Sequence, residues 1–265
     1  MNLNLKGLRK HWDLFAASDP LWAILTNPDR KGSRWDVGEF FQTGVWEIEQ
    51  SMEQVTAWLP SLPKRRALDF GCGVGRLTQA LAGYFEHVDG VDISASMIQQ
   101  ANDYNQHGSR CQYVVNQKGD LRIFPGQHFD FIYSTITLQH MPPRYSRRYI
   151  AEFMRVLAPG GAVLFQLPSE TRQSGSTVGR AVRTFYYRFL WDILHPDTPY
   201  MGMYGVPKEQ VVRLLARHGG RLLHAGADPA AEPEWEGYRY MATRITPEGG
   251  VVPAVPEDKA MTGAD

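Results

Sequence analysis

Residues 67–81 read ALDFGCGVGRLTQAL, and the architecture of the chain can be built outward from them. The short apolar run that ends at Phe70 is typical of a buried parallel strand. Three glycines within the next five positions let the backbone turn sharply and let a ligand approach it closely. Leu77 and Leu81 recur at helical spacing, so a helix begins just after the glycines with its first amide groups free to face a ligand. The stretch therefore predicts a strand, a tight glycine turn and a helix.

The spacing of the glycines distinguishes between the nucleotide ligands that such a turn could bind. A P-loop needs Gly-Lys-Ser/Thr at its end, whereas this turn ends in Gly75-Arg76-Leu77. A dinucleotide fingerprint needs a further glycine at position 76, where an arginine stands instead. The sequence therefore favours neither a phosphate cradle nor hydride chemistry.

The same residues resemble motif I of the class I S-adenosylmethionine-dependent methyltransferases. That motif places an acidic residue two positions before a Gly-x-Gly-x-Gly run, and the chain matches it with Asp69, Gly71, Gly73 and Gly75. The resemblance covers about residues 64–245. It implies an α/β fold with a Rossmann-like, doubly wound sheet of seven mostly parallel strands, the final one antiparallel. It also implies S-adenosyl-L-methionine as the cofactor.

A second short apolar strand, residues 88–93, contains Asp92, which lies 21 residues after Gly71. An acid at this distance can bond the two ribose hydroxyls of an adenosine that lies across the strand ends. Capping of the next helix by Asp92 or Ser94 is the alternative. Capping explains the residue type but not the spacing, so we favour the cofactor role.

The third expected strand, residues 112–116, leads to Gly119-Asp120-Leu121. Here the resembling family commonly has a residue that bonds the adenine amino group. Asp120 is the first candidate and Asn116 the second. A turn aspartate without any ligand role is the alternative for Asp120.

The fourth expected strand, residues 129–134, matches the family's Phe-Asp-x-Val/Ile signature and ends at Ser134. Substrates of open α/β folds bind beyond such strand ends. The Asn/Asp/Ser-Pro-Pro-Tyr/Phe motif of methyltransferases that act on adenine or glutamine is absent here. Residues 134–140 contain no carboxylate, so metal-assisted methylation lacks support and we predict no metal.

The resemblance assigns cofactor contacts to residues of motif I, of the second strand, of the loop after the third strand and of the fourth strand. These residues are Asp69, Gly71, Gly73, Gly75, Asp92, Ile93, Asp120 and Ser134.

His140 is the candidate catalytic base. A histidine whose pKa lies near neutrality can take a proton from a hydroxyl or amine nucleophile. The alternative is a structural histidine that supports the cofactor pocket, since apolar residues flank it. The sequence leaves both roles open.

The flanking segments define the expected organisation. Residues 1–60 form a helical N-terminal extension or lid, residues 61–245 the methyltransferase domain, and residues 246–265 a tail whose composition predicts disorder. Within the domain, residues 169–206 are an insertion expected to cover the substrate. Its basic aromatic helix, residues 177–195, could hold an anionic or aromatic acceptor, touch a membrane surface, bind a partner or simply pack. Aromatic residues of the extension are lid candidates, with ordinary core packing as the alternative: Trp12, Trp22, Trp35, Phe40 and Phe41.

The charge balance, cysteine count and hydropathy of the chain limit its expected partners and location. The 265 residues carry 28 lysines and arginines against 28 aspartates and glutamates, so no net charge favours nucleic acid or a membrane. Two cysteines are too few for a disulfide framework, and no stretch is apolar enough to span a bilayer, so we expect a cytoplasmic protein.

The function expected from these features is methyl transfer to a small molecule, first to oxygen and otherwise to nitrogen or carbon. Non-methylating chemistry on the same cofactor, or a catalytically silent scaffold, is the alternative. The acceptor and the oligomeric state stay open.

Overall fold

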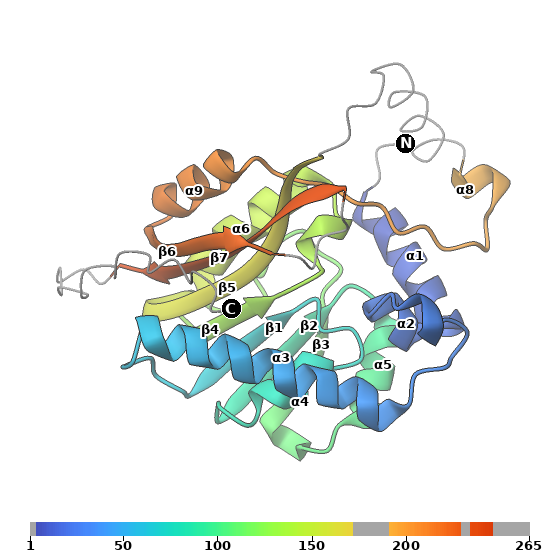
Figure 1. Cartoon of the computed structure of the whole chain (residues 1–265), viewed down its shortest axis with the longest axis horizontal. Coiled ribbons are helices and arrows are strands. Elements are labelled where there is room, and N and C mark those ends of the chain that lie inside the picture. The colour runs from blue at the N-terminus through green and yellow to red at the C-terminus, as the bar shows by residue number, and fades with distance from the viewer. Residues whose placement is uncertain (1–3, 172–190, 229–233, 246–265) are drawn as a thin grey trace, which may run out of the picture.

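The computed structural model describes residues 4–171, 191–228 and 234–245, and one seven-stranded sheet runs through them (Figure 1). Its strands are β1 (Arg66–Phe70), β2 (His87–Asp92), β3 (Cys111–Val115), β4 (Phe129–Ser134), β5 (Leu157–Thr171), β6 (Gly220–Ala227) and β7 (Trp235–Arg244). The strand order is β3-β2-β1-β4-β5-β7-β6. β7 pairs antiparallel with both β5 and β6, and the other pairs are parallel. The expected mostly parallel sheet with an antiparallel final strand is confirmed.

Helices follow the strands on both sides of the sheet. They are α1 (Leu5–Ser18), α2 (Pro20–Ile24), α3 (Val37–Trp58), α4 (Arg76–Leu81), α5 (Ala95–Tyr104), α6 (Pro143–Val156), α8 (Trp191–Leu194) and α9 (Lys208–Arg217), with short 3-10 turns η1 (Pro28–Arg30), η2 (Gly108–Arg110) and η3 (Leu138–His140). Side-chain caps account for several helix starts. The Asp36 carboxylate accepts from the Glu39 amide at 2.9 Å and begins α3, and the Ser94 hydroxyl accepts from the Met97 amide at 3.1 Å and begins α5.

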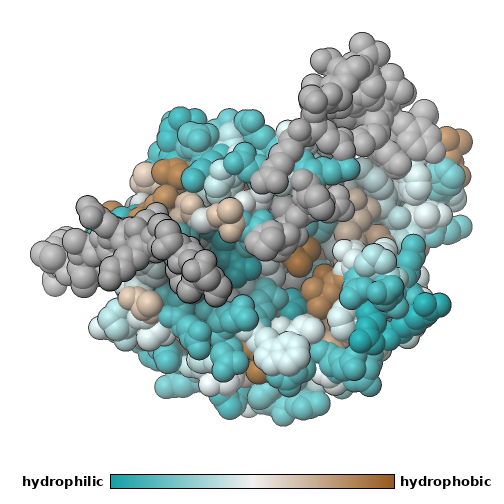
Figure 2. All heavy atoms as spheres, in the orientation of Figure 1, coloured by the Kyte–Doolittle hydropathy of each residue, from teal (hydrophilic) through white to brown (hydrophobic). Residues whose placement is uncertain are grey.

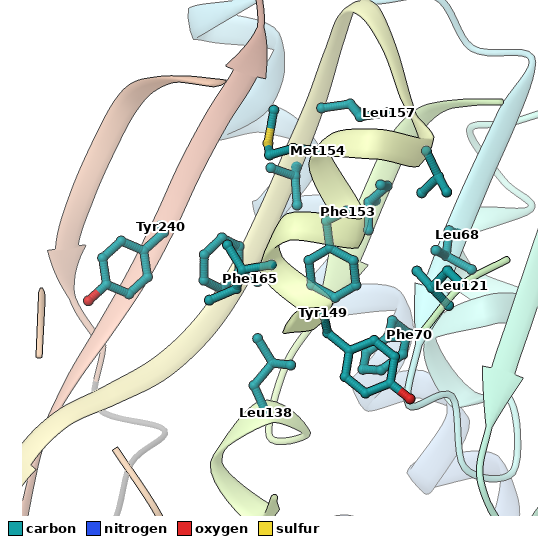
Figure 3. Close-up of a cluster of buried hydrophobic side chains, with 14 of the residues drawn as sticks. Leu68, Phe70, Leu121, Leu138, Tyr149, Phe153, Met154, Leu157, Phe165 and Tyr240 are labelled. Carbon is teal, nitrogen blue, oxygen red and sulfur yellow. The ribbon is translucent and has the colours of Figure 1, made fainter. Parts of the chain in front are cut away.

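Strand residues alternate between two apolar layers, which explains why the strands read as continuous apolar runs. Leu68 and Ile132 face the layer that contains α6 and α9, whereas Ala67 and Phe131 face the layer that contains α3 and α4. Figure 3 shows the first layer, where Phe153 of α6 lies between strand residues. The sheet is therefore doubly wound.

The N-terminal helices reach the sheet through one close approach. A Cβ atom added to Gly44 of α3 would lie 2.6 Å from the carbonyl oxygen of Arg76, so only glycine lets α3 pack this closely on α4. α1 packs on α5, and Figure 1 shows α1 and α2 together on that side of the molecule.

α3 begins at Val37, where Asp36 caps it. One element boundary differs from the sequence expectation. β5 continues to Thr171, so residues 169–171 of the expected insertion belong to the strand, where Thr171 pairs with Trp235. The basic aromatic helix expected over residues 177–195 lies outside the described residues except for its end, where α8 is helical.

Candidate functional site

The glycine turn after β1 has a backbone that only glycine adopts without strain. Gly71 has φ +81°, and its amide donates to the carbonyl oxygen of Val91 at 2.8 Å, which holds the turn against β2. A Cβ atom at Gly71 would lie 2.2 Å from the Thr137 side chain. The turn is therefore clamped between β2 and the loop after β4.

Asp92 fastens the end of β2 to this turn. Its Oδ2 accepts from the Gly73 amide at 3.0 Å, and its Oδ1 accepts from the Ser94 amide at 2.9 Å. Burial raises the pKa of Asp92, while these backbone hydrogen bonds oppose the shift. The helix cap is Ser94 rather than Asp92, so the capping alternative does not account for Asp92.

A pocket opens where β1, β2 and β4 end, and α1 and α2 cover it. The empty space between its lining residues is about 910 Å³, with the open mouth included. Figure 2 shows mostly hydrophilic surface on one face of the molecule, with apolar atoms recessed near its centre. The pocket is lined by Leu5, Leu8, Trp12, Ala23, Ile24, Phe70, Gly71, Cys72, Gly73, Arg76, Leu77, Val91, Asp92, Ile93, Met97, Asn116, Thr135, Ile136, Thr137, His140, Met141 and Tyr149.

The structure brings five of the predicted site residues into this lining: Gly71, Gly73, Asp92, Ile93 and His140. Gly75 stands just behind it as the N-cap of α4, with φ +87°. Its neighbour is Tyr113, whose hydroxyl would lie 2.5 Å from a Cβ atom at Gly75.

Asp69 and Ser134 lie beneath the lining. The Thr78 hydroxyl donates to the buried Asp69 carboxylate at 2.6 Å, and burial raises the pKa of Asp69 to about 7 against that hydrogen bond. The Ser134 hydroxyl donates to the carbonyl oxygen of Phe70 at 3.0 Å. Both residues support the strand ends from below.

Asp120 and Asn116, the two candidates for the adenine contact, point in different directions. The Asp120 carboxylate accepts from Arg148 Nη2 at 2.9 Å on the outside of the loop, and Asp120 is not part of the lining. Asn116 is buried in the pocket wall, and its Nδ2 donates to the carbonyl oxygen of Asp120 at 2.6 Å. The geometry favours Asn116 for the contact that the sequence assigned first to Asp120.

His140 is buried, with hydrogen-bond partners at both ring nitrogens. Nδ1 lies 2.9 Å from the carbonyl oxygen of Gly202, which can only accept, so Nδ1 carries the proton. Nε2 is then the acceptor for the Gln139 amide at 3.2 Å. Burial lowers the pKa of His140 to about 4, although the Gly202 carbonyl opposes the shift. These contacts favour a positioning role, and the catalytic role stays a prediction.

Sequence reasoning named one further lining residue, Trp12, and missed another, Arg76. Trp12 is the one lid candidate that lines the pocket, and its ring meets that of His140 edge-on at 5.6 Å. Arg76 was seen only as a departure from other motifs, yet it is buried in the lining and bonds Glu47 of α3 at 2.7 Å. A charged residue directly after the glycine turn was the available signal.

Family comparison agrees with this geometry. Residues 67–161, which hold the glycine turn, Asp92 and β4, match a family model described as a methyltransferase domain. The match supports a class I S-adenosylmethionine-dependent methyltransferase, as the sequence motifs predict. Among curated relatives, the chain is similar to the ubiquinone biosynthesis O-methyltransferase of Coxiella burnetii, with 32% identity over 130 residues, covering 48% of this chain and 49% of that protein.

A second relative has a different named substrate. The chain is 33% identical over 115 residues to the trans-aconitate 2-methyltransferase of Deinococcus radiodurans, covering 43% of this chain and 42% of that protein. The chain spans about half the length of the curated relatives it matches.

Solved structures support the fold of the chain. The magnesium protoporphyrin IX methyltransferase of Synechocystis, crystallised with bound S-adenosylhomocysteine, is similar with a TM-score of 0.59 at 19% identity. The similarity covers 91% of this chain and all of that chain. At this identity it shows the shared architecture.

Neither a metal-binding cluster nor a membrane-spanning helix is present among the described residues. In the part of the chain that the structure describes, no three His, Cys, Asp or Glu side chains are grouped to hold a metal ion. No helix among the same residues is both long and apolar enough to cross a bilayer.

Proposed function

We propose that this methyltransferase transfers a methyl group from S-adenosyl-L-methionine to a small-molecule acceptor, with a hydroxyl oxygen as the first choice of acceptor atom. The observation that carries the proposal is the joining of Gly71, Gly73 and Asp92 in one pocket at the strand ends. Open α/β sheets bind their ligands at this edge.

The pocket residues fit the cofactor. The Asp92 oxygens each accept one backbone hydrogen bond and keep lone pairs for the two ribose hydroxyls. Ile93 and Met97 add apolar surface beside Asp92 for the adenine ring, and Asn116 adds an amide. Gly71 and Gly73 line the pocket beside Thr137 and Ile24, where their backbone would face the methionine end of the cofactor.

When bound, the cofactor supplies an electrophilic methyl group on a sulfonium. The protein's task is then to align the acceptor and to exclude water. α1 and α2 cover the pocket with Trp12 and Ile24, and the backbone of residues 135–137 forms the wall nearest the end of β4. The His140 imidazole also lines the pocket, where its lowered pKa keeps it neutral and Nδ1 donates to the Gly202 carbonyl oxygen.

The choice of oxygen rests on one relative and on two hydroxyls in the pocket lining. One relative is named for O-methylation in ubiquinone biosynthesis, and Thr135 and Thr137 offer hydroxyls that could bond a hydroxyl-bearing acceptor. Nitrogen and carbon acceptors would be separated from oxygen acceptors by product analysis.

Calorimetric titration with S-adenosylmethionine and S-adenosylhomocysteine tests the cofactor site. We expect saturable binding by the wild type and at least about tenfold weaker binding by Asp92→Ala, because hydrogen bonds to a charged group contribute roughly 1.5–3 kcal/mol. Asp103→Ala, which removes an exposed acid from α5, is the matched control and should bind normally. Equal affinities of the two variants would refute the assignment of Asp92. Absence of binding by folded wild type would refute the proposed function.

A further inference from the structure

A polar cluster lies on the α3 side of the sheet, next to the pocket, and the cofactor site does not account for it. Its members are Arg239 of β7, Asp228 after β6, Tyr133 of β4 and Glu47 of α3. Tyr133 and Asp228 are almost fully buried, at 1% and 6% exposure. Buried polar side chains normally have a reason to be there, either a structural partner or a ligand.

Arg239 has hydrogen-bond donors that are not engaged by the described residues. Its Nε donates to Asp228 Oδ2 at 2.6 Å, and its side chain is 26% exposed. Within the described residues, its two Nη groups donate to no acceptor. A guanidinium offers five N–H donors in a rigid fork, so the side turned away from Asp228 remains available.

Strand pairing places Arg239 beside the pocket wall. Arg239 is the register partner of Gln166 on β5, and directly paired residues project to the same face of a sheet. Gln166 Oε1 accepts from the amide of Ile136, a lining residue, at 3.3 Å. Arg239 is therefore the cross-strand neighbour of Gln166, which bonds the loop after β4.

Glu47 approaches the cluster from the other side without occupying the Arg239 fork. Its Oε1 accepts from the Tyr133 hydroxyl at 2.9 Å, and its Oε2 accepts from Arg76 at 2.7 Å. Burial raises the pKa of Tyr133 well above its ordinary value, with Glu47 adding to the shift and Arg239 opposing it. Tyr133 is thus a neutral donor, and the charge of Arg239 acts within the cluster.

We propose that Arg239 is a specificity-determining residue that binds a carboxylate or similar oxyanion on the acceptor. Only ligand groups that present acceptor oxygens suit an open guanidinium fork, and a charged, two-oxygen group suits it best. The inference rests on the proposed function, because it places the head group of the acceptor beside the wall near which methyl transfer would occur. The competing role for Arg239 is neutralisation of buried Asp228 alone.

The test uses the full chain loaded with S-adenosylhomocysteine and follows the ¹⁵N–¹H signals of arginine side chains. The probes are 4-hydroxybenzoate and inorganic phosphate as anions, with 4-hydroxybenzamide as the neutral control. We expect an anion, but not the amide, to shift the Arg239 signal saturably. Arg213, an exposed arginine of α9, provides the matched signal that should not move.

Two variants separate binding from folding. Arg239→Lys keeps a cation beside Asp228 but loses the fork, and the double variant Asp228→Asn with Arg239→Gln removes the buried pair together. Both should bind the anions at least about tenfold more weakly, as expected for a lost charged hydrogen bond, whereas Arg213→Gln should bind them like the wild type. Undiminished anion binding by the double variant, or no shift of the Arg239 signal with any probe, would overturn the inference. Either result would leave S-adenosylhomocysteine binding, and so the proposed function, intact.

Discussion

Gly71 packs directly against the side chain of Thr137 at the base of the pocket. A Cβ atom on Gly71 would lie 2.2 Å from the Thr137 Cγ2 atom and 2.3 Å from its hydroxyl oxygen. Gly71 belongs to the turn after β1, and Thr137 belongs to the loop after β4, which pair as neighbouring strands. The cofactor turn and the expected acceptor wall are therefore one packed unit.

Gly71→Ala should destabilise the fold much more than Gly108→Ala. Both glycines have positive φ, +81° and +55°, so alanine pays a conformational cost of about 1–2 kcal/mol at either position. Gly108 has nothing within 4 Å of an added Cβ atom, whereas Gly71 meets Thr137. We expect Gly71→Ala to lose at least about 3 kcal/mol of unfolding free energy, measured by urea denaturation. Equal losses at the two positions would show that the contact with Thr137 yields easily.

The fold was predictable because its signals are local. The strand, glycine turn and helix of residues 67–81, the strand at 129–134 and the acid at position 92 each follow from short patterns. Continuous apolar runs predicted buried parallel strands, and the alternation of Leu68 and Ala67 between two apolar layers confirms that reading.

The site was less predictable because it depends on long-range packing. Asn116 and Asp120 stand four positions apart on one loop, and two hydrogen bonds within that loop hold the Asn116 side chain. Its Nδ2 donates to the Asp120 carbonyl, and its Oδ1 accepts from the Lys118 amide. Trp12 reaches the pocket because α1 packs on α5, a contact between segments far apart in the chain. The end of β5 extends to Thr171 because the strand pairs with β7. The sequence of residues 169–171 does not predict this pairing.

Asn116→Ala should weaken S-adenosylhomocysteine binding more than Asp120→Ala. Asn116 lines the pocket, whereas Asp120 forms an outward ion pair with the half-exposed Arg148. Because Asp120 is not part of the lining, Asp120→Ala should leave the Kd within about fivefold of the wild type, a difference of roughly 1 kcal/mol. Calorimetric Kd values for S-adenosylhomocysteine, measured on both variants, test this prediction. A larger loss in Asp120→Ala would restore Asp120 as the adenine contact.

Glu47→Gln should destabilise the protein because it leaves Arg76 without a counter-ion. The Arg76 side chain is 3% exposed and the Glu47 side chain 22%. Removing one partner of a buried pair costs roughly 3–5 kcal/mol, and the partial exposure of Glu47 places our expectation near the lower end. Glu49→Gln, an exposed glutamate on the same helix, is the control and should change the unfolding free energy by less than about 0.5 kcal/mol. If the two variants unfold alike in urea, the Arg76–Glu47 pair does not stabilise the fold.

The His140 imidazole should make the fold sensitive to mild acid. Its pKa is lowered to about 4 in the folded protein, while in the unfolded chain it should have its ordinary value of about 6.5. The unfolded chain therefore binds more protons between these values, and stability falls as the pH decreases through this window. From pH 7 to pH 5 the loss should be about 2 kcal/mol.

A difference measurement isolates this effect from other groups. Burial raises the pKa of Asp69 to about 7, which acts in the opposite direction because its stabilising contribution is lost as the pH increases. The unfolding free energy of the wild type minus that of His140→Asn cancels the contribution of Asp69. This difference should shrink by about 2 kcal/mol between pH 7 and pH 5. A difference independent of pH would mean that His140 titrates normally in the folded protein, which would make a base near neutrality available and favour the catalytic role over the positioning role.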